Sequence, residues 1–412
     1  MGFFTMSHIQ SEKKSSDTEK CGGMCRLNIK CKRPYQKSYG KGELSILFIG
    51  SVPTSEEDES GNKMTGDASE LLKKISKKAG IPIGKCLKVN AIRCYTYQEV
   101  HQKEIDSCRV LLRRTIEEFK PHIIIPMGTL AINSLIAPEW KGKTGSHAQW
   151  VGFQIPSRLY NAWICPTYHP AWILENGDEV LLKIMKEHLE GAKSLLNTPV
   201  QNKWEPSKEI EIMEDPKEIV RRINHYRKEG GAIAFDYETT GLKPDADHMK
   251  IASNSICWKG IETIAYMMED PRVINATRKI LESPSNGKIA SNLKFEHRWT
   301  KQKLGITVSN WIWDTMLSAH VLDNRRGICS IKFQSYIRYG IGSYDKHIHP
   351  YLVAKESNDL NKIFELDRGD LLLYNGLDSL LEYKVAVDQM RESGMPWLNE
   401  KKKRNKKVRN RV

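Results

Sequence analysis

Two carboxylates one residue apart, Asp236 and Glu238, stand at the end of a short apolar run and are followed by Gly241. This pattern predicts a buried strand that delivers acid groups to a sheet edge and then turns. Side chains at positions i and i+2 of a strand point to the same face, so both carboxylates can bind a single hard cation. Oxygen ligands of this kind suit Mg²⁺ or Mn²⁺. The pair therefore indicates a candidate metal site.

Two later segments add acid groups to this site. Glu296 lies where a predicted strand over residues 288–291 gives way to a helix. Tyr374 and Asp378 lie on a predicted helix over residues 371–390, where the spacing of four places them on one face. Two cations held about 3.5–4 Å apart by such groups can activate a water and stabilise the leaving oxygen in phosphodiester hydrolysis.

The order Asp-x-Glu, Asn-x-x-Phe-acid, Tyr-x-x-x-Asp resembles the 3′→5′ proofreading exonuclease domains of family A DNA polymerases, within the DEDD superfamily. The resemblance implies an RNase H-like fold with a mixed sheet and two Mg²⁺ or Mn²⁺ ions held chiefly by Asp236, Glu238 and Asp378. It also implies that Tyr374 orients the attacking water. The resemblance also implies that Glu296 helps to hold the ions through a water. The family usually has Asp at this position, and Glu296 keeps the charge on a longer side chain.

The bulk composition favours a polyanionic partner. The 412 residues carry a formal charge of +14 with a pI near 9.2, although eight of the basic residues lie in Lys401 to Arg411. No apolar run approaches a membrane span, and the first 20 residues lack the apolar core of a signal peptide, so we expect no membrane contact and a cytoplasmic protein. Nine Cys in such a chain favour metal, cluster or buried-thiol roles over disulfides.

The first half of the chain alternates predicted strands and helices. This alternation predicts a doubly wound parallel sheet with helices on both faces, whose ligands gather at the carboxyl ends of the strands. The predicted strands cover residues 44–50, 87–90, 122–127 and 163–166, and the predicted helices cover 68–79, 104–119 and 129–136. The strand ends carry Gly50, Ser51, Asn90, Gly128 and His169.

Residues 21–196 resemble the family 4, iron–sulfur, uracil-DNA glycosylases. The resemblance rests on Cys25-Arg26-Leu27, Phe48-Ile49-Gly50, Glu57-Asp58, Asn90, Cys94, Cys108 and His169-Pro170-Ala171. It implies that Cys21, Cys25, Cys94 and Cys108 hold a [4Fe–4S] cluster. It further implies that Asn90 binds the edge of a flipped base and that His169 stabilises charge developing on the uracil. Cys31 and Cys86 are spare thiols for the cluster, and Cys165, Cys257 and Cys329 are predicted core residues.

The departures from that family fall in the base pocket, formed by Gly50, Ser51, Met64, Asn90 and His169. Ser51 stands where the family has an acid beside the attacking water, and Met64 stands where it has the Phe that stacks on the base. The first two Cys are also separated by three residues rather than two. These changes predict a DNA-binding module with weak or absent uracil excision. Glu57 or Asp58 could replace the missing acid, so an active glycosylase is the alternative.

The predicted organisation is two α/β domains with polar ends. It comprises a disordered tail (1–20), a glycosylase-like domain (21–197), a linker (198–215), an exonuclease domain (216–395) and a basic tail (396–412). The predicted function is 3′→5′ hydrolysis of single-stranded or frayed DNA ends. The alternatives are an active glycosylase–exonuclease and a non-catalytic DNA-binding fragment of a split phage DNA polymerase, which would act with a polymerase segment in the bacterial host. RNA trimming of the RNase D kind is disfavoured by Thr239-Thr240-Gly241-Leu242, which looks more like the polymerase version.

Overall fold

The computed structural model describes residues 25–395 except residues 30, 141, 202, 343 and 357. The chain divides into two compact units, which are treated separately below. The first unit comprises residues up to Lys203 together with Tyr336–Ser343, and the second comprises Trp204–Ser335 and the chain from Tyr344 onward. Within the described residues, no helix is both long and apolar enough to cross a membrane.

The first unit is built on a five-stranded sheet with the strand order β2-β1-β3-β5-β4. The first four strands in this order are parallel, and only the edge strand β4 is antiparallel to its neighbour. The strands are β1 (Ile46–Gly50), β2 (Leu87–Asn90), β3 (Ile123–Pro126), β4 (Ile155–Ser157) and β5 (Ala162–Ile164). The parallel strands therefore present their carboxyl ends, and the residues that follow them, at one edge of the sheet.

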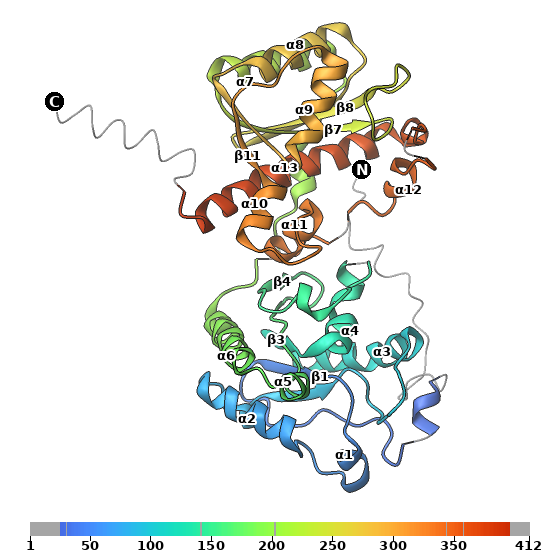
Figure 1. Cartoon of the computed structure of the whole chain (residues 1–412), viewed down its shortest axis with the longest axis vertical. Helices are drawn as coiled ribbons and strands as arrows, with labels where there is room; N and C mark the ends of the chain where they lie inside the picture. The colour runs from blue at the N-terminus through green and yellow to red at the C-terminus, as the bar shows by residue number, and fades with distance from the viewer. Residues whose placement is uncertain are drawn as a thin grey trace, which may run out of the picture. The chain divides into compact units, whose positions relative to one another are not determined.

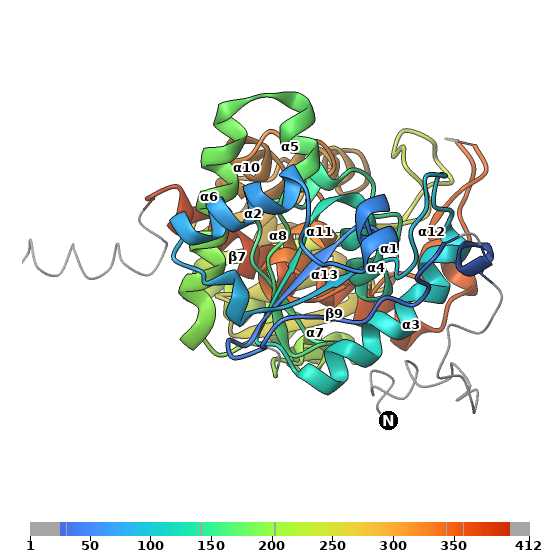
Figure 2. The ribbon, with the colours of Figure 1, turned by 90° about the horizontal axis from the view of Figure 1, so that it is seen from below.

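Helices cover both faces of this sheet (Figures 1 and 2). On one face, α2 packs with α5 and α6 over Ile46, Phe48, Ile123 and Ile125. On the other side α3 packs with α4. The helices are α1 (Ser55–Ser60), α2 (Asp67–Lys78), α3 (Gln102–Phe119), α4 (Gly128–Trp140), α5 (Pro170–Asn176) and α6 (Glu179–Ser194). The predicted doubly wound α/β fold is confirmed for this unit.

The second unit is built on a six-stranded mixed sheet with the order β11-β10-β7-β8-β9-β6. Strands β7, β8 and β9 are antiparallel neighbours, whereas β10, β11 and β6 join by parallel pairing. The strands are β6 (Ile210–Ile212), β7 (Gly231–Thr239), β8 (Ile251–Trp258), β9 (Glu262–Met267), β10 (Asn286–Ala290) and β11 (Trp311–Asp314). This is the mixed sheet that the RNase H-like prediction requires.

Helices lie on both faces of the mixed sheet as well (Figure 1). The pair α7 (Pro216–Glu229) and α8 (Pro271–Glu282) buries one face, and α13 (Arg368–Glu392) crosses the other beneath β6 to β9. Because α13 is covered by the sheet and by α10, most of its side chains are buried, including those of Asp378 and Glu382. The remaining helices are α9 (Leu293–Trp299), α10 (Thr315–Leu322), α11 (Ile331–Tyr339) and α12 (His349–Leu352).

The structure differs from the sequence prediction in two segments. The expected linker, residues 198–215, includes β6, which pairs in parallel with β9. Ile210 of β6 fills the space above Gly376 of α13, where an added Cβ would lie 2.5 Å from the isoleucine Cγ2. Residues 336–343, predicted to belong with the exonuclease, group with the first unit, where Tyr336 packs against Trp140 and Trp150.

Candidate functional site

Strand β7 presents Asp236 and Glu238 on one face of the mixed sheet. The intervening Tyr237 points to the opposite face, where its buried hydroxyl lies 3.0 Å from Thr300 Oγ1. The pairing of β7 with β8 runs in continuous register through Glu238 and shifts only at Thr239. The alternation of a regular strand thus aims both carboxylates at α13, as the sequence predicts.

Helix α13 presents Tyr374 and Asp378 toward these carboxylates. Asn375, between them in sequence, donates its amide hydrogens to Asp236 Oδ2 (2.8 Å) and to the Asp236 carbonyl oxygen (3.1 Å). Its own amide oxygen accepts from Ser253 Oγ of β8 at 3.0 Å. Asn375 therefore joins the helix to the strand by hydrogen bonds at the point where their acid groups meet. Asn375 was not among the predicted site residues, although its position next to Tyr374 could have indicated a place in the site.

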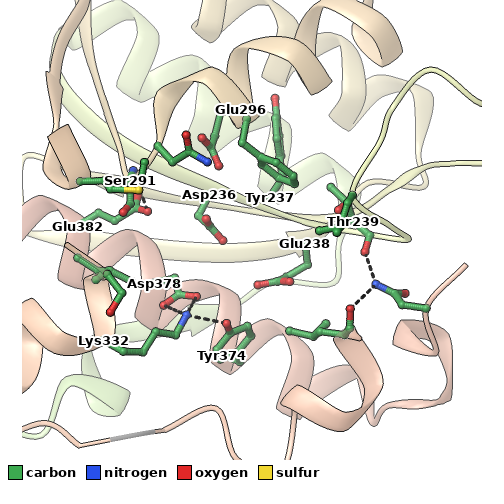
Figure 3. Close-up of a pocket in the computed structure, with 18 of the residues that line it drawn as sticks. Asp236, Tyr237, Glu238, Thr239, Ser291, Glu296, Lys332, Tyr374, Asp378 and Glu382 are labelled. Atoms are coloured by element: carbon green, nitrogen blue, oxygen red, sulfur yellow. Dashed lines mark hydrogen bonds and ion pairs between the residues drawn. The ribbon is translucent and has the colours of Figure 1, made fainter. Parts of the chain in front are cut away.

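Asp236, Glu238 and Asp378 each place a carboxylate oxygen within 4.8 Å of the other two. They face a cavity of about 370 Å³ that is also lined by Glu296, Lys332, Tyr374 and Glu382. Figure 3 shows the carboxylates of the three residues directed toward the centre of this cavity. Three converging carboxylates have the chemistry of a hard-cation site, so the residues fit the divalent metal that the sequence predicts.

Lys332 and Tyr344 bind Asp378 in this structure. Lys332 Nζ lies 3.0 Å from Asp378 Oδ2 and donates to Tyr374 Oη at 2.8 Å (Figure 3). The hydroxyl of Tyr344 donates to Asp378 Oδ1, and its ring lies 5.9 Å from that of Tyr374. Burial alone would lower the pKa of Lys332, but the carboxylate of Asp378 outweighs it and raises that pKa. Tyr344 carried no motif and was not predicted.

Glu296 reaches the cavity from the junction of β10 and α9. Asn292, at the start of α9, adopts the left-handed conformation with φ 66°. The Asp314 carboxylate fixes this turn by accepting the amide hydrogens of Asn292 (3.2 Å) and Leu293 (3.0 Å). Glu296 is buried in the same cavity but does not belong to the group of three carboxylates within 4.8 Å.

Glu382 is a fifth acid in the cavity and was absent from the sequence prediction. It lies one helical turn after Asp378 on α13, and its Oε1 accepts the backbone N–H of Ser291 at 3.1 Å. The spacing of four from Asp378 was the available signal. Burial, and then the nearby carboxylates, raises the pKa of Asp236, Glu238, Glu296 and Glu382 well above the usual range. Cation binding at this site is therefore linked to proton release.

The first unit gathers thiols in a second buried cluster. Cys25, Cys94 and Cys108 pack with Leu27, Ile92 and Ile105, and Cys31 packs against this group. The amide of Tyr35 donates to Cys94 Sγ at 3.4 Å. Burial, followed by smaller contributions from the adjacent Cys31 and Cys108 thiols, raises the pKa of Cys94 to about 12. Four soft donors in one apolar pocket fit an iron–sulfur cluster.

The other predicted thiols do not all lie at this cluster. Cys21 lies outside the described residues, whereas Cys31, predicted as a spare, belongs to the cluster region. Cys86 packs in a different core, where its thiol donates to the Pro82 carbonyl at 3.8 Å. Cys165 and Cys257 are buried core residues as predicted, but Cys329 is only half-buried, so its description as a core residue needs correction.

Four of the five predicted base-pocket residues meet at the carboxyl edge of the parallel sheet. Asn90, the last residue of β2, covers Gly50, where an added Cβ would lie 2.3 Å from Asn90 Oδ1. A Cβ on Gly128, after β3, would lie 3.1 Å from His169 Cβ and 3.6 Å from Ser51 Oγ. Met64 differs, because its side chain packs against the apolar core.

The two acids that could replace the missing carboxylate are both engaged by backbone amides. Glu57 Oε1 accepts from Met64 at 3.0 Å and its Oε2 accepts from Thr54 at 3.1 Å. Asp58 Oδ1 and Oδ2 accept from Arg33 and Lys32, each at 2.8 Å. Both carboxylates are therefore occupied in fixing backbone segments, which is a structural role.

His169 caps helix α5 while facing the pocket edge. Its Nδ1 accepts the backbone N–H of Ala171 at 3.2 Å, and burial lowers its pKa to about 4. The ring is therefore neutral near pH 7, and because Nδ1 is an acceptor the proton resides on Nε2. A neutral donor at this position can stabilise a developing negative charge without a prior protonation step.

A parallel α/β unit, with predicted base-pocket residues at the carboxyl edge of its sheet, and an RNase H-like unit with a carboxylate centre define a two-domain α/β protein. Residues 37–190 match the family model described as the uracil DNA glycosylase superfamily. Residues 209–352 match the model described as 3′-5′ exonuclease. The chain thus carries a uracil-DNA glycosylase superfamily domain followed by a 3′-5′ exonuclease domain, and it is an exonuclease-type enzyme.

Relatives of both domains are recognisable. The type-4 uracil-DNA glycosylase of Thermotoga maritima is 27% identical over 164 residues, covering 38% of this chain and 81% of that protein. The DNA polymerase of Bacillus phage SP01 is 24% identical over 346 residues, covering 75% of this chain. The chain spans only 36% of that polymerase. Among solved structures, Escherichia coli RNase D covers 45% of this chain and 45% of its own, at 13% identity and a TM-score of 0.36.

Proposed function

We propose that this chain is a 3′→5′ DNA exonuclease that uses two divalent cations. The observation that carries this proposal is the convergence of Asp236, Glu238 and Asp378 within 4.8 Å of one another, beside Tyr374 on the same helix as Asp378. Asp236, Glu238 and Asp378 hold the cations. When bound, the cations activate a water and neutralise the developing charge on the leaving oxygen.

Tyr374 orients the attacking water in this proposal. Its oxygen accepts a hydrogen bond from Lys332 Nζ at 2.8 Å, which leaves the phenolic hydrogen free to donate into the cavity. Burial, and then the charge of Asp378, raises the pKa of Tyr374 well above its usual range. The side chain thus stays a neutral donor that positions the water rather than removing its proton.

DNA is the favoured substrate, with a polymerase segment as a candidate partner. The similarity to the Bacillus phage SP01 DNA polymerase extends across both domains, because it covers 75% of this chain. We infer that the exonuclease trims single-stranded or frayed 3′ ends, in the manner of a proofreading domain, within the bacterial cytoplasm. Basic side chains supply the sequence-independent part of the affinity.

The decisive experiment uses a 5′-labelled single-stranded DNA and a matched RNA, each incubated with the protein in Mg²⁺ or in EDTA. We expect a Mg²⁺-dependent ladder that shortens the DNA from its 3′ end and leaves the RNA largely intact. Faster degradation of the RNA would favour the RNase D type of function instead. Binding of DNA without any shortening would favour a non-catalytic DNA-binding fragment.

We further propose that the glycosylase-type domain binds DNA with weak or absent uracil excision. Ser51 stands at the position of the water-positioning acid, and the carboxylates of Glu57 and Asp58 are held by four backbone amides. Asn90 and His169 retain the chemistry to bind a base edge and to stabilise charge on it. Substrate binding is thereby preserved more fully than water activation.

Restoring the acid should restore excision. We expect Ser51→Glu combined with Met64→Phe to raise cleavage at an internal uracil by about 10²-fold, the lower end of what a positioned acid or base contributes. The measurement is an alkali-dependent cut in EDTA, which silences the exonuclease. The same double variant carrying His169→Ala serves as the control and should lose the gain. Efficient excision by the unmodified protein would refute the proposal of a weakened pocket.

A [4Fe–4S] cluster is proposed for the buried thiols of the first unit. Cys25, Cys94 and Cys108 supply three ligands, and the resemblance to the iron–sulfur glycosylases names Cys21 as the fourth. Cys31 contacts the same group and is the competing fourth ligand. Asp58 holds the amides of the two residues that follow Cys31, which fixes this thiol near the site.

Removing one ligand should release the cluster. We expect Cys94→Ser to lose iron, acid-labile sulfide and visible absorbance, because its thiol lies at the centre of the buried group. Cys86→Ser is the matched control: it changes an equally buried thiol in another core and should keep its iron. Iron in Cys94→Ser equal to that of the unmodified protein would exclude this site. The same assay on Cys21→Ser and Cys31→Ser identifies the fourth ligand.

A further inference from the structure

Glu382 is a buried acid that no motif of the exonuclease assigns. Only 1% of its surface is exposed, and its Oε2 has no hydrogen-bond partner among the described residues. Its Oε1 accepts the amide of Ser291 at the end of β10, which directs the carboxylate to the side of Asp236 away from Tyr374 (Figure 3). The side chain lines the same cavity as the carboxylate centre.

Glu296 is a second buried acid that faces this cavity. It is 2% exposed, and its Oε2 is likewise buried without a hydrogen-bond partner in the described part of the chain. Asp236 is the carboxylate with the strongest electrostatic effect on both glutamates. Glu296 and Glu382 therefore flank Asp236 on the side that the first group of three carboxylates does not occupy.

Each of the two glutamates keeps one buried oxygen without a hydrogen-bond partner among the described residues, and this carries a desolvation cost unless a cation or a proton compensates it. The ammonium of Lys332 is already engaged with Asp378 and Tyr374. A divalent cation beside Asp236 would satisfy both free oxygens at once. The three flexible bonds of each glutamate allow the two carboxylates to close on such an ion, whereas the shorter aspartate would reach less far.

We propose that Glu382 is a direct ligand of the second divalent cation, which it binds together with Asp236 and Glu296. Asp236, Glu238 and Asp378 would hold the first cation, so Asp236 would contribute to both sites. This assignment rests on the proposed two-cation function of the site and adds a ligand to it. It also accounts for a glutamate at position 296, because Glu296 and Glu382 approach the ion from different elements, α9 and α13.

The test is the number of Mn²⁺ ions bound per chain, measured by electron paramagnetic resonance titration of free Mn²⁺. The unmodified chain should bind two ions at this site, and Glu382→Gln should bind one with unchanged affinity while the affinity for the second falls at least tenfold. The amide oxygen of Gln can still accept from Ser291, so a purely structural role for Glu382 would leave both ions in place. Glu392→Gln, an exposed change of the same kind on α13, should bind two.

Several outcomes would overturn the assignment while leaving the exonuclease intact. Two ions of unchanged affinity in Glu382→Gln, or the loss of both, would remove Glu382 from the second site. If the unmodified chain bound no Mn²⁺ and degraded no DNA, the proposed function itself would fail. Should Glu382→Gln not fold, Glu382→Asp provides the second variant, because its shortened carboxylate should weaken only the second ion; an unweakened second ion in that variant would also overturn the assignment.

Discussion

Asp236→Asn is expected to lower Mg²⁺-dependent exonuclease activity by at least ~10³-fold, because cation stabilisation of the transition state contributes several kcal/mol and about 1.4 kcal/mol corresponds to a factor of ten. Asp236 belongs to the group of three carboxylates and is also the carboxylate that contributes most to raising the pKa of Glu296 and of Glu382. The substitution keeps the volume of the side chain and an oxygen near Asn375, so the fold should persist.

The measurement is the single-turnover rate of 3′ shortening of a labelled DNA at saturating Mg²⁺. Asp247→Asn is the matched control, since it makes the same change at an exposed position of the same unit that does not line the cavity. Its rate should equal that of the unmodified protein. Retention of more than about a tenth of the rate in Asp236→Asn would mean that the reaction does not depend on this carboxylate.

Lys332→Met is expected to destabilise the cation-free protein by about 3 kcal/mol, the lower end of the range for breaking a buried ion pair. Lys332 Nζ lies 3.0 Å from Asp378 Oδ2, and the two side chains are 22% and 5% exposed. Without the ammonium, Asp378 would face Asp236 and Glu238 with only the hydroxyl of Tyr344 as a partner. Mg²⁺ should recover much of this loss, because a bound cation replaces the missing positive charge.

The measurement is thermal unfolding in EDTA and in Mg²⁺, taken from the transition whose midpoint Mg²⁺ shifts. Because a two-domain chain can unfold in more than one step, that transition identifies the second unit. Lys362→Met is the control: Lys362 pairs with Glu365 at 3.5 Å and both side chains are more than half exposed, so at most about 1 kcal/mol should be lost. An equal loss of stability in EDTA and in Mg²⁺ would show that the positive charge of Lys332 does not substitute for that of the cation.

These two variants separate the roles of charge in the site. In the proposed function Asp236 binds the cations, whereas Lys332 compensates the charge of Asp378 when the cations are absent. In Lys332→Met the competing ammonium is gone, so the apparent affinity for Mg²⁺ should rise even if the rate falls. Asp236 and Lys332 both belong to the second unit, so the iron content of the first unit should be unchanged in either variant and serves as an internal control.

The sequence alone determined the local parts of this protein. The alternation of β7 and the four-residue spacing on α13 follow from backbone geometry, so Asp236 with Glu238, and Tyr374 with Asp378, were placed on common faces without a tertiary structure. Strand β2 has the predicted bounds, and most other predicted elements begin or end within a few residues of the observed ones. The alternation of strands and helices gave the α/β class of the first unit, and the resemblance of the acid motifs implied that of the second.

Only the tertiary structure decided which distant residues meet. Glu382, Asn375, Tyr344 and Lys332 join the site because α13 and its neighbours pack across the mixed sheet, and no local pattern encodes that packing. In the first unit, backbone amides far along the chain engage the Asp58 carboxylate, which the sequence left as a candidate catalytic acid. Spacing fixes the direction of a side chain on its own element, but its partners depend on how burial brings separate elements together.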